Sequence, residues 1–454
     1  MITIEEFGRR LRARRITSAE VTDECLRRVD ADNPRLNAFI HVTADEARRQ
    51  AREADAEIAA GRDRGPLHGV PISIKDLLDV RGLATTAASR VREGHVAARD
   101  AATIAHLRQA GAVFVGKTNL HEFAFGTTNE DSAFGPARNP HDPARSPGGS
   151  SGGSAASVAA GMALATIGTD TGGSIRIPAA ACGLVGLKPS LGEVSIDGVV
   201  PLSQTMDHVG PLALTVADAC LVHHALLGDA HAALPAPMPL HGLRLAVPRG
   251  YFFDVLDPEV RARFDEAVDR LRAGGVHVDD IEIHHTAIIA PVYLHIVLSD
   301  AAAYHASTLD AVPDRYTSNV RIRLEMGRYV LAEDYVRALA GREVLRREVD
   351  AALAQHDALA LPTLAIPAPP LGASTVQVGG AAEPVRNVML RLTQPFNVTG
   401  HPAISIPSGR TTAGLPCGMQ LVGCRMQTDA LLRVALACEP QIALGFPRSG
   451  NVGG

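Results

Sequence analysis

SPGGSSGGSAASVAAGMALATIGTDTGGSIRIP, residues 146–178, is the stretch that most strongly indicates the fold. Its Ala-rich segment 154–162 predicts a helix, and the apolar run at 163–168 predicts a strand directly after that helix. Gly- and Ser-rich turns flank both segments. A helix that leads into a strand through a short turn is typical of α/β proteins.

The same alternation recurs on both sides of this stretch. The chain predicts a strand at 70–74, a helix at 101–110, a strand at 112–115, and then a strand at 243–248, a helix at 257–273 and a strand at 276–283. Strands that alternate with helices in this way predict an α/β protein with parallel strand pairs.

The two ends of the chain fit the same class. Capping-box spacing at Thr17 and Glu20, and again at Thr43 and Glu46, predicts two helix starts near the N-terminus. Further elements are expected as a helix-rich segment at 285–350, strands at 358–361, 403–406 and 419–422, and a last helix at 428–440. The tail at 447–454 is expected to be frayed.

Two stretches have linker-like composition, 228–241 and Pro-rich 362–372. Neither is long enough to require a domain boundary, and late apolar strands can rejoin a sheet that begins early. We therefore expect residues 1–454 to form a single domain.

Composition excludes several classes of protein. Of 454 residues, 44 are Lys or Arg and 49 are Asp or Glu, and the net charge of -5 argues against a dedicated nucleic-acid binder. The six cysteines form no C-x-x-C pair and are expected to stay reduced. Without a visible signal peptide or an uninterrupted apolar run of about 18 residues, no membrane partner is expected, and a cytoplasmic location is the default.

The Gly/Ser-rich segment 146–154 allows three interpretations. A flexible linker fits the composition, but the segment lies between ordered elements, so close approach of the backbone to a ligand is the better interpretation. A phosphate-binding loop would need a Lys after its last Gly, and none follows.

The segment DTGGSIRIP, residues 170–178, is the best candidate for a nucleophile loop. Ser174 follows two glycines at the end of a predicted strand, and Pro178 fits the first turn of a short helix. The backbone N–H groups of Thr171, Gly172, Gly173 and Ser174 could then converge in one concave turn that stabilises an oxyanion. An ordinary Gly-rich turn explains the same letters.

Lys75 ends the apolar strand in GVPISIKD, residues 69–76. A lysine at such a position usually points to solvent. If it is instead buried, its charged form is disfavoured and it can act as a base near neutral pH.

Other candidates are weaker. His121 and Glu122 suggest a metal site, but no H-E-x-x-H pattern or Cys/His cluster supports one. The adjacent pair at 284–285 is expected on the surface. Asp207 and His208 could complete a triad with Ser174, but adjacent Asp and His fit no known triad geometry.

Taken together, these segments resemble the amidase signature family. The resemblance rests on GVPISIKD (69–76), GPARNPHDPARSPGGSSGGSAASVAAG (135–161), GTDTGGSIRIPAAACGLVGLKPS (168–190), the SxxxDxxGPLA pattern at 203–213, LALPT (359–363) and PFNVTGHPAISIPSG (395–409). The two family serines are separated by 24 residues, as are Ser150 and Ser174. The resemblance covers nearly the whole chain and is strongest at about 65–215.

The resemblance implies a fold, a triad and a reaction. The fold would be one large twisted mixed sheet with helices on both faces. Lys75 matches the family's catalytic lysine, Ser174 its nucleophile, and Ser150 its bridging serine, which follows a cis peptide bond. The N–H groups at 171–174 match the oxyanion hole, and no metal or organic cofactor is required. The stand-alone amidase branch and a homodimer are the expected forms.

The substrate pocket is less well indicated by the sequence. Phe125, Gly126, Thr127 and Asn129 are candidate substrate-binding residues, with the segment 390–400 expected opposite them, and Arg176 is a further candidate. An internal ion pair with Asp170 is the preferred explanation of Arg176. Ser151 and Ser154 are expected to form helix-cap or loop hydrogen bonds. In the absence of another cluster of Arg or Lys, a neutral small-molecule amide is the favoured substrate.

Three other functions stay open. A carbamate or aryl ester would react through the same tetrahedral chemistry. The A subunit of glutamyl-tRNA(Gln) amidotransferase, a glutaminase that works in a complex, looks similar over the same segments, but it usually has Gln where this chain has Ile177. A non-catalytic protein with the same fold is disfavoured by the intact Lys75, Ser150 and Ser174.

Overall fold

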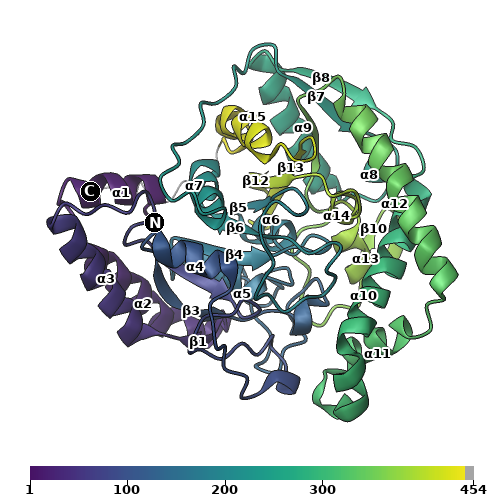
Figure 1. The fold of residues 1–454 in the computed structure, drawn as a ribbon. Helices are drawn as coiled ribbons and strands as arrows, with labels where there is room; N and C mark the ends of the chain where they lie inside the picture. The colour runs from purple at the N-terminus through teal and green to yellow at the C-terminus, as the bar shows by residue number, and fades with distance from the viewer. Residues whose placement is uncertain (445–454) are drawn as a thin grey trace.

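One mixed sheet of eleven strands forms the centre of the computed structural model, which describes residues 1–444 (Figure 1). In spatial order the sheet runs β1-β3-β2-β4-β6-β5-β12-β13-β9-β7-β8. Its strands are β1 (Phe39–Val42), β2 (Pro71–Lys75), β3 (Val113–Thr118), β4 (Ala165–Thr169), β5 (Val185–Lys188), β6 (Val209–Ala213), β7 (Arg244–Pro248), β8 (His277–Ile281), β9 (Ala358–Pro362), β12 (Ala403–Arg410) and β13 (Pro416–Val422). A separate hairpin consists of β10 (Thr375–Val378) and β11 (Ala381–Pro384). The tail at 447–454 lies outside the described residues.

Strand direction differs between the flanks and the middle of the sheet. Strand β2 runs parallel to β3 and β4, and β7 runs parallel to β8 and β9, as the sequence predicts. From β4 across to β9, every neighbouring pair is antiparallel. The edge strand β1 also pairs antiparallel with β3. The prediction of parallel pairs is therefore correct for β2 with β3 and β4 and for β7 with β8 and β9, and not for the other pairs.

Helices cover both faces of this sheet. Along one side α4, α7, α15 and α9 pack against one another in succession, and elsewhere α5 packs against α6 and against strands β2 and β4. The helices are α1 (Ile4–Arg12), α2 (Ser18–Leu36), α3 (Ala44–Ala59), α4 (Ala102–Gln109), α5 (Gly152–Ala159), α6 (Arg176–Cys182), α7 (Val216–Leu226), α8 (Tyr251–Asp254), α9 (Pro258–Ala273), α10 (Ile289–Ala311), α11 (Ser318–Gly327), α12 (Ala332–Leu353), α13 (Val385–Leu390), α14 (Gln394–Thr399) and α15 (Thr428–Ile442). Short 3-10 turns are η1 (Arg90–Arg92), η2 (Glu122–Ala124), η3 (Thr286–Ile288) and η4 (Pro313–Arg315).

The predicted helix starts have different outcomes. Thr17 and Glu20 form the full capping box at the start of α2. Thr43 also precedes a helix, α3, but its side chain makes no cap, so that prediction is wrong in mechanism. Its hydroxyl instead donates to the Phe114 carbonyl at 2.8 Å, because the side chain is buried against β3.

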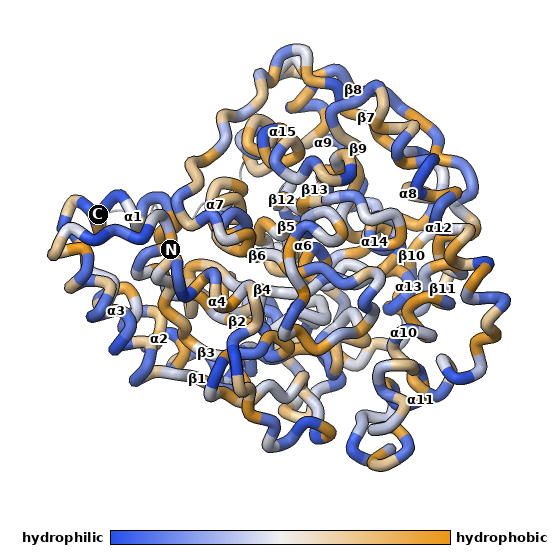
Figure 2. The backbone as a smooth tube through the Cα atoms, viewed as in Figure 1, coloured by the Kyte–Doolittle hydropathy of each residue, from blue (hydrophilic) through white to orange (hydrophobic). Residues whose placement is uncertain are grey.

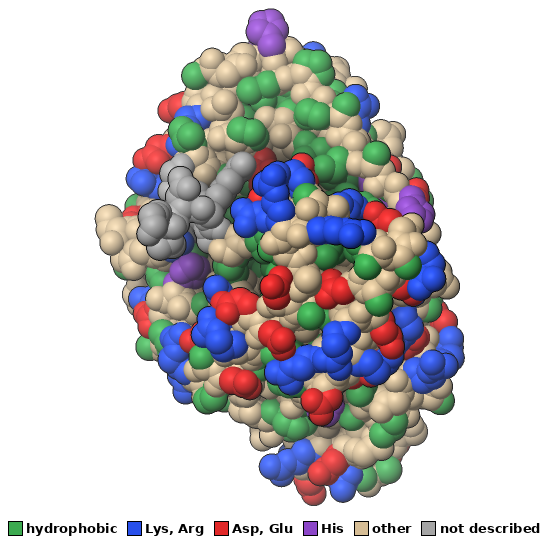
Figure 3. Space-filling view, turned by 90° about the vertical axis from the view of Figure 1, so that its left-hand side faces the viewer, with side chains coloured by type: hydrophobic (Ala, Val, Ile, Leu, Met, Phe, Trp, Pro, Cys, Tyr) green, Lys and Arg blue, Asp and Glu red, His purple; other side chains and the backbone are tan. Residues whose placement is uncertain are grey.

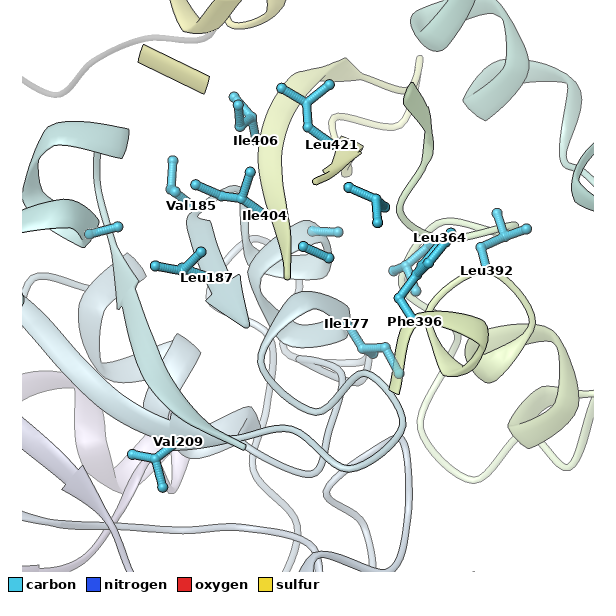
Figure 4. Packing of buried hydrophobic residues seen from close by; sticks show 14 of the residues in the cluster. Ile177, Val185, Leu187, Val209, Leu364, Leu392, Phe396, Ile404, Ile406 and Leu421 are labelled. Atoms are coloured by element: carbon cyan, nitrogen blue, oxygen red, sulfur yellow. The ribbon is translucent and has the colours of Figure 1, made fainter. Parts of the chain in front are cut away.

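Apolar side chains of the central strands form the core on one face of the sheet (Figure 4). Leu187 on β5 lies opposite Ile404 on β12, and Ile404 lies opposite Leu421 on β13. All three are fully buried. Burial of such a side chain contributes about 1.5–3 kcal/mol, so this row fixes the register of the three strands.

The opposite face of the same strands also carries buried polar side chains. Because successive residues of a strand point to opposite faces, Ser405 and Gln420 project away from the core formed by Ile404 and Leu421. Ser405 exchanges a hydrogen bond with Thr363 (2.8 Å), and Gln420 accepts one from Arg176 of α6 (2.6 Å). The central strands thus stabilise the fold on one face and hold the start of α6 on the other.

The helical segment near residue 300 is notably apolar. Thr286–Ala311 is the one described helix that is long and apolar enough, by length and composition, to cross a membrane, and 44% of its most apolar window is buried. A buried core helix passes the same test. Here α10 packs against α11, α12 and α14, on the right-hand side of Figure 1.

Polar residues lie mainly at the periphery. In Figure 2, hydrophilic residues dominate the outlying helices α2 and α3, whereas hydrophobic ones gather around the central strands. On the face drawn in Figure 3, acidic and basic side chains are interspersed and form no basic stripe. All six cysteines are unpaired, as the sequence predicts.

Candidate active site

Lys75 is the last residue of β2 and is completely buried. Its Nζ donates to the Ser150 hydroxyl at 2.8 Å and to the Thr169 hydroxyl at 2.7 Å. Thr169 ends β4, which runs parallel to β2, so the carboxyl ends of the two strands bring these side chains together. The structure therefore favours the buried base over a solvent-exposed lysine.

Burial also sets the protonation of Lys75. It lowers the pKa of Lys75 from 10.5 to about 7, although the negative charges of Asp170 and Asp207 act in the opposite direction. A large fraction of Lys75 is therefore neutral at physiological pH. A neutral amine that contacts a serine hydroxyl can accept its proton.

The loop that carries Ser150 is closely packed and is not a flexible linker. The Gly149–Ser150 peptide bond is cis. A Cβ atom at Gly149 would lie 2.7 Å from the Asn129 nitrogen, and one at Gly153 would lie 2.5 Å from the Ala38 carbonyl oxygen. These glycines are required because the backbone of this loop touches neighbouring backbone.

The nearby serines form loop hydrogen bonds. Ser151 donates to the Thr169 carbonyl (3.2 Å), and Ser154 exchanges a hydrogen bond with Thr118 (2.6 Å). These contacts agree with the structural roles that the sequence indicates for Ser151 and Ser154.

Ser174 lies on the turn between β4 and α6 and is 6% exposed. The Ser151 N–H donates to the Ser174 carbonyl at 3.3 Å, so the loops that carry the two serines lie side by side. Among the hydrogen bonds of residues 1–444, none joins the hydroxyls of Ser150 and Ser174 directly. Transfer between them belongs to the proposal below.

The turn before Ser174 is held from outside. The Thr171 hydroxyl donates to Asp207 (2.5 Å), and the Gly172 carbonyl accepts from the Thr393 hydroxyl (2.6 Å). Within the described chain, no protein acceptor takes the backbone N–H of residues 171–174. Four donors therefore stay available in one turn, which fits the expected oxyanion hole of Thr171, Gly172, Gly173 and Ser174.

Arg176 is a structural residue of this turn. Its guanidinium binds both carboxylate oxygens of Asp170 (3.0 and 2.9 Å), and further bonds reach Asn397 and Gln420 (2.6 Å each). The side chain has no exposed area. Its inclusion among the substrate-binding residues is therefore not supported, because protein groups occupy its donors. The internal ion pair is the interpretation that fits.

This network carries a stability prediction. Although burial alone would raise the pKa of Asp170, the charge of Arg176 holds it below its ordinary value. Arg176→Met leaves that carboxylate buried without its cation, so we expect a loss of about 3–5 kcal/mol in the free energy of unfolding. Denaturant titration at pH 7 measures it. A loss below about 1 kcal/mol would contradict the structural role.

The alternative triad is not formed. Asp207 accepts from Thr171 and from the backbone N–H groups of Leu202 and Ser203, and burial raises its pKa to about 6. The ring of His208 contacts Lys188 Nζ (3.2 Å) and the Asp170 carbonyl (3.0 Å). Asp207 therefore supports the oxyanion turn, and His208 belongs to a separate buried network.

The histidine candidates for a metal site also have other contacts. His121 faces Asp131 at 3.1 Å, and Glu122 accepts from the backbone and hydroxyl of Thr317. The described residues contain no group of three or more His, Cys, Asp or Glu side chains that could hold a metal ion. His284 and His285 lie exposed on the surface, as expected.

Ser174 lines an inner pocket together with residues of four distant segments. Phe125, Gly126 and Thr127 line it, as the sequence predicts. Asn129 does not take part, because its side-chain oxygen accepts from the Gly153 N–H (3.0 Å) and so holds the catalytic loop. The inner pocket is lined by Ala124, Phe125, Gly126, Thr127, Thr171, Gly172, Ser174, Leu202, Tyr293, Arg386 and Leu390.

An outer cavity of about 310 Å³ adjoins the inner pocket. The two share Gly126, Thr127 and Arg386, so they adjoin at these residues. Leu390 belongs to the segment 390–400 that the sequence places opposite the loop, whereas Tyr293 and Arg386 are not predicted from the sequence. No local pattern marks these two residues, because only the folded chain brings α10 and α13 to the loop at 124–127.

A buried lysine lies close to two serines and a donor-rich turn, beside a pocket. These features define an amide-hydrolysing enzyme. Comparison with known proteins agrees. The family model described as Amidase matches residues 20–432. An amidase from Pseudomonas putida is 40% identical over 96% of this chain and 95% of its own length. A crystal structure of an amidase superposes with a TM-score of 0.92 at 37% identity, covering 97% of this chain and all of the other.

The A subunit of the glutamyl-tRNA(Gln) amidotransferase of Roseiflexus sp. (strain RS-1) is also similar, with 39% identity over 96% of both chains. The chain belongs to the amidase signature family.

Proposed function

We propose that this enzyme hydrolyses a carboxamide through an acyl-enzyme on Ser174, with Ser150 and Lys75 moving the protons. Neutral Lys75 accepts the proton of the Ser150 hydroxyl while Ser150 accepts that of Ser174. The Ser174 oxygen then forms a bond to the amide carbon. The N–H groups of residues 171–174 stabilise the oxyanion.

The protons return by the same route. Lys75, now protonated, gives its proton back through Ser150 to the leaving nitrogen, the C–N bond breaks, and an amine and an ester on Ser174 result. Water loses a proton to the same relay, attacks the ester and releases the carboxylic acid. Each turnover consumes one water and needs no external base.

One observation carries this proposal more than any other. Lys75 Nζ lies 2.8 Å from Ser150 Oγ in a fully buried site, and burial lowers the pKa of Lys75 to about 7. Hydrogen bonds to two hydroxyls would also satisfy a lysine with a purely structural role, but a lowered pKa beside the Ser150 hydroxyl is what a proton relay requires.

A fluorophosphonate probe tests the nucleophile directly. We expect folded protein to form one covalent adduct, which peptide mass spectrometry assigns to Ser174, since the probe's phosphorus traps an activated serine. Protein denatured before labelling is the control. Absence of an adduct from folded protein that hydrolyses no amide would overturn the proposed function.

A glutaminase that works within a complex is the second candidate, and relatives named as the A subunit of an amidotransferase favour it. We propose a stand-alone enzyme instead, because this chain has Ile177 where the family resemblance implies Gln in the A subunits. Hydrolysis by the purified chain without partner, ATP or tRNA supports the stand-alone enzyme. Strict dependence on glutamine and a partner supports the glutaminase. Carbamates and aryl esters belong in the same substrate screen.

A homodimer and a cytoplasmic location complete the proposal. Family resemblance supports the first, and six unpaired cysteines are consistent with the reducing conditions of the second. Light scattering of the purified protein and fractionation of the source cells test them.

A further inference from the structure

Two arginines converge at the entrance to the inner pocket. Arg386 of α13 lines both the inner pocket and the outer cavity, and Arg323 of α11 lines the outer cavity. Of the described residues that line the inner pocket, Arg386 alone carries a formal charge. A substrate that reaches Ser174 therefore passes a guanidinium group.

Neither cation forms a close ion pair with the protein. Within residues 1–444, no carboxylate lies within 4 Å of Arg323 or Arg386, although the charge of Asp131 acts on Arg323 from farther away. The Nε atom of Arg386 is buried and has no hydrogen-bond partner. Arg323 donates to the Phe125 carbonyl (2.5 Å), a neutral acceptor on the pocket loop. Buried donors without partners cost free energy, and a ligand can supply the missing acceptors.

The two charges also act on each other. Burial, followed by the charge of Arg386, lowers the pKa of Arg323 to about 10. Arg323 is therefore still charged at neutral pH, although the neighbouring guanidinium of Arg386 repels it in a partly desolvated place. An anion placed between them would relieve this repulsion.

The acidic side chains of the outer cavity do not act as the anion that would pair with both arginines. Asp131 contacts His121 (3.1 Å) and the Asn319 amide (3.1 Å), and Glu130 accepts from the Gly372 N–H (3.0 Å). Neither acid forms a close ion pair with an arginine, although the charge of Asp131 favours the cationic form of Arg323. The Nε donor of Arg386 therefore stays available to a ligand.

We propose that Arg386, assisted by Arg323, binds a carboxylate of the substrate. The amide that this enzyme prefers then carries a carboxylate on the portion that extends from the scissile bond into the outer cavity. Guanidinium groups match carboxylates in planar, two-point contacts, which both attract and orient the ligand. This inference rests on the proposed function and replaces the neutral amide that the sequence favours.

A matched substrate series tests it. Primary amides with a terminal carboxylate are compared with analogues of the same length that end in hydroxymethyl, over several chain lengths. For the best length we expect wild-type kcat/KM to favour the carboxylate at least about 30-fold, because loss of a desolvated charge contact is large. Arg386→Met should lower kcat/KM for that carboxylate about 100-fold, mainly through KM, and for the neutral analogue less than about threefold.

Two controls keep the test decisive. Arg347→Met removes an exposed arginine from α12. It should leave kcat/KM unchanged for both the carboxylate substrate and its neutral analogue. If Arg386→Met fails to fold, wild-type enzyme still gives an answer: glutarate should inhibit hydrolysis of the neutral amide competitively, 1,5-pentanediol should not, and added salt should weaken the inhibition.

The outcomes separate this inference from the proposed function. Neutral amides cleaved as fast as carboxylated ones, or an equal loss on both in Arg386→Met, would overturn carboxylate binding alone. No hydrolysis of any amide, together with no labelling of Ser174, would overturn the proposed function itself.

Discussion

Ser174→Ala is expected to lower kcat for amide hydrolysis by roughly 10⁴- to 10⁶-fold, because loss of a catalytic serine removes the covalent route. The oxyanion donors at 171–174 and the inner pocket would survive, so substrate should still bind with little change in affinity. Steady-state kinetics measures the first effect, and calorimetric binding of substrate to the inactive variant measures the second.

The structure also predicts that this variant folds. Removing one hydroxyl from a turn fixed by the Thr171–Asp207 and Gly172–Thr393 contacts leaves those contacts in place. The melting temperature should stay within a few degrees of wild type. Ser299→Ala is the matched control, since Ser299 donates to the His295 carbonyl on α10 and lies outside the pocket lining. Comparable rates for Ser174→Ala and this control would exclude Ser174 as the nucleophile.

The sequence predicts most strands of the sheet, including β9, β12 and β13 near its middle, but it does not predict β1, β5 or β6. Strands β2, β3, β4, β7 and β8 alternate with helices and carry the periodicity expected of parallel units. The sequence gives no clear strand signal for β5 and β6, because Val185–Lys188 and Val209–Ala213 are short and each contains a glycine. Only the tertiary pairing of β5 with β12 and β6 explains why these segments are extended.

The proposed catalytic groups are more predictable from the sequence than the pocket. Lys75 and Ser150 could be recognised because motif and spacing place them, and the structure brings them to 2.8 Å. The pocket wall depends on helices that join the loop at 124–127 only after folding. For that reason no sequence pattern marks Arg386. Arg176 lies close to Ser174 in the sequence, which suggests a substrate-binding role that its buried contacts do not support.

Lys75→Met is expected to lower kcat by several orders of magnitude, because the relay loses its base. In wild type, kcat/KM should fall about tenfold per pH unit below pH 7, where Lys75 becomes protonated and can no longer accept the Ser150 proton. Rate profiles from pH 5 to pH 9 measure this dependence. A wild-type rate that stays flat between pH 5 and pH 7 would argue against Lys75 as the base.

Lys75→Met should also make the protein more stable than wild type, by an amount that depends on pH. Unfolded Lys75 has its ordinary pKa of 10.5 and folded Lys75 a pKa of about 7, so between these values the unfolded chain holds a proton that the folded chain lacks. The contribution of Lys75 to wild-type stability therefore falls as pH drops from about 10.5 to 7 and is constant below pH 7. Its full cost is about 5 kcal/mol.

Lys75→Met removes that cost, although Ser150 and Thr169 lose a donor and offset part of the gain. Denaturant titrations of both proteins at pH 7 and pH 9.5 should show the variant's advantage shrinking by about 1.4 kcal/mol per pH unit as pH rises. An advantage that does not depend on pH would mean that folded Lys75 keeps an ordinary pKa. The expected variant is inactive, and its stability advantage over wild type is larger at pH 7 than at pH 9.5. That result would mean that the buried amine of Lys75 costs stability and is retained because catalysis needs its neutral form.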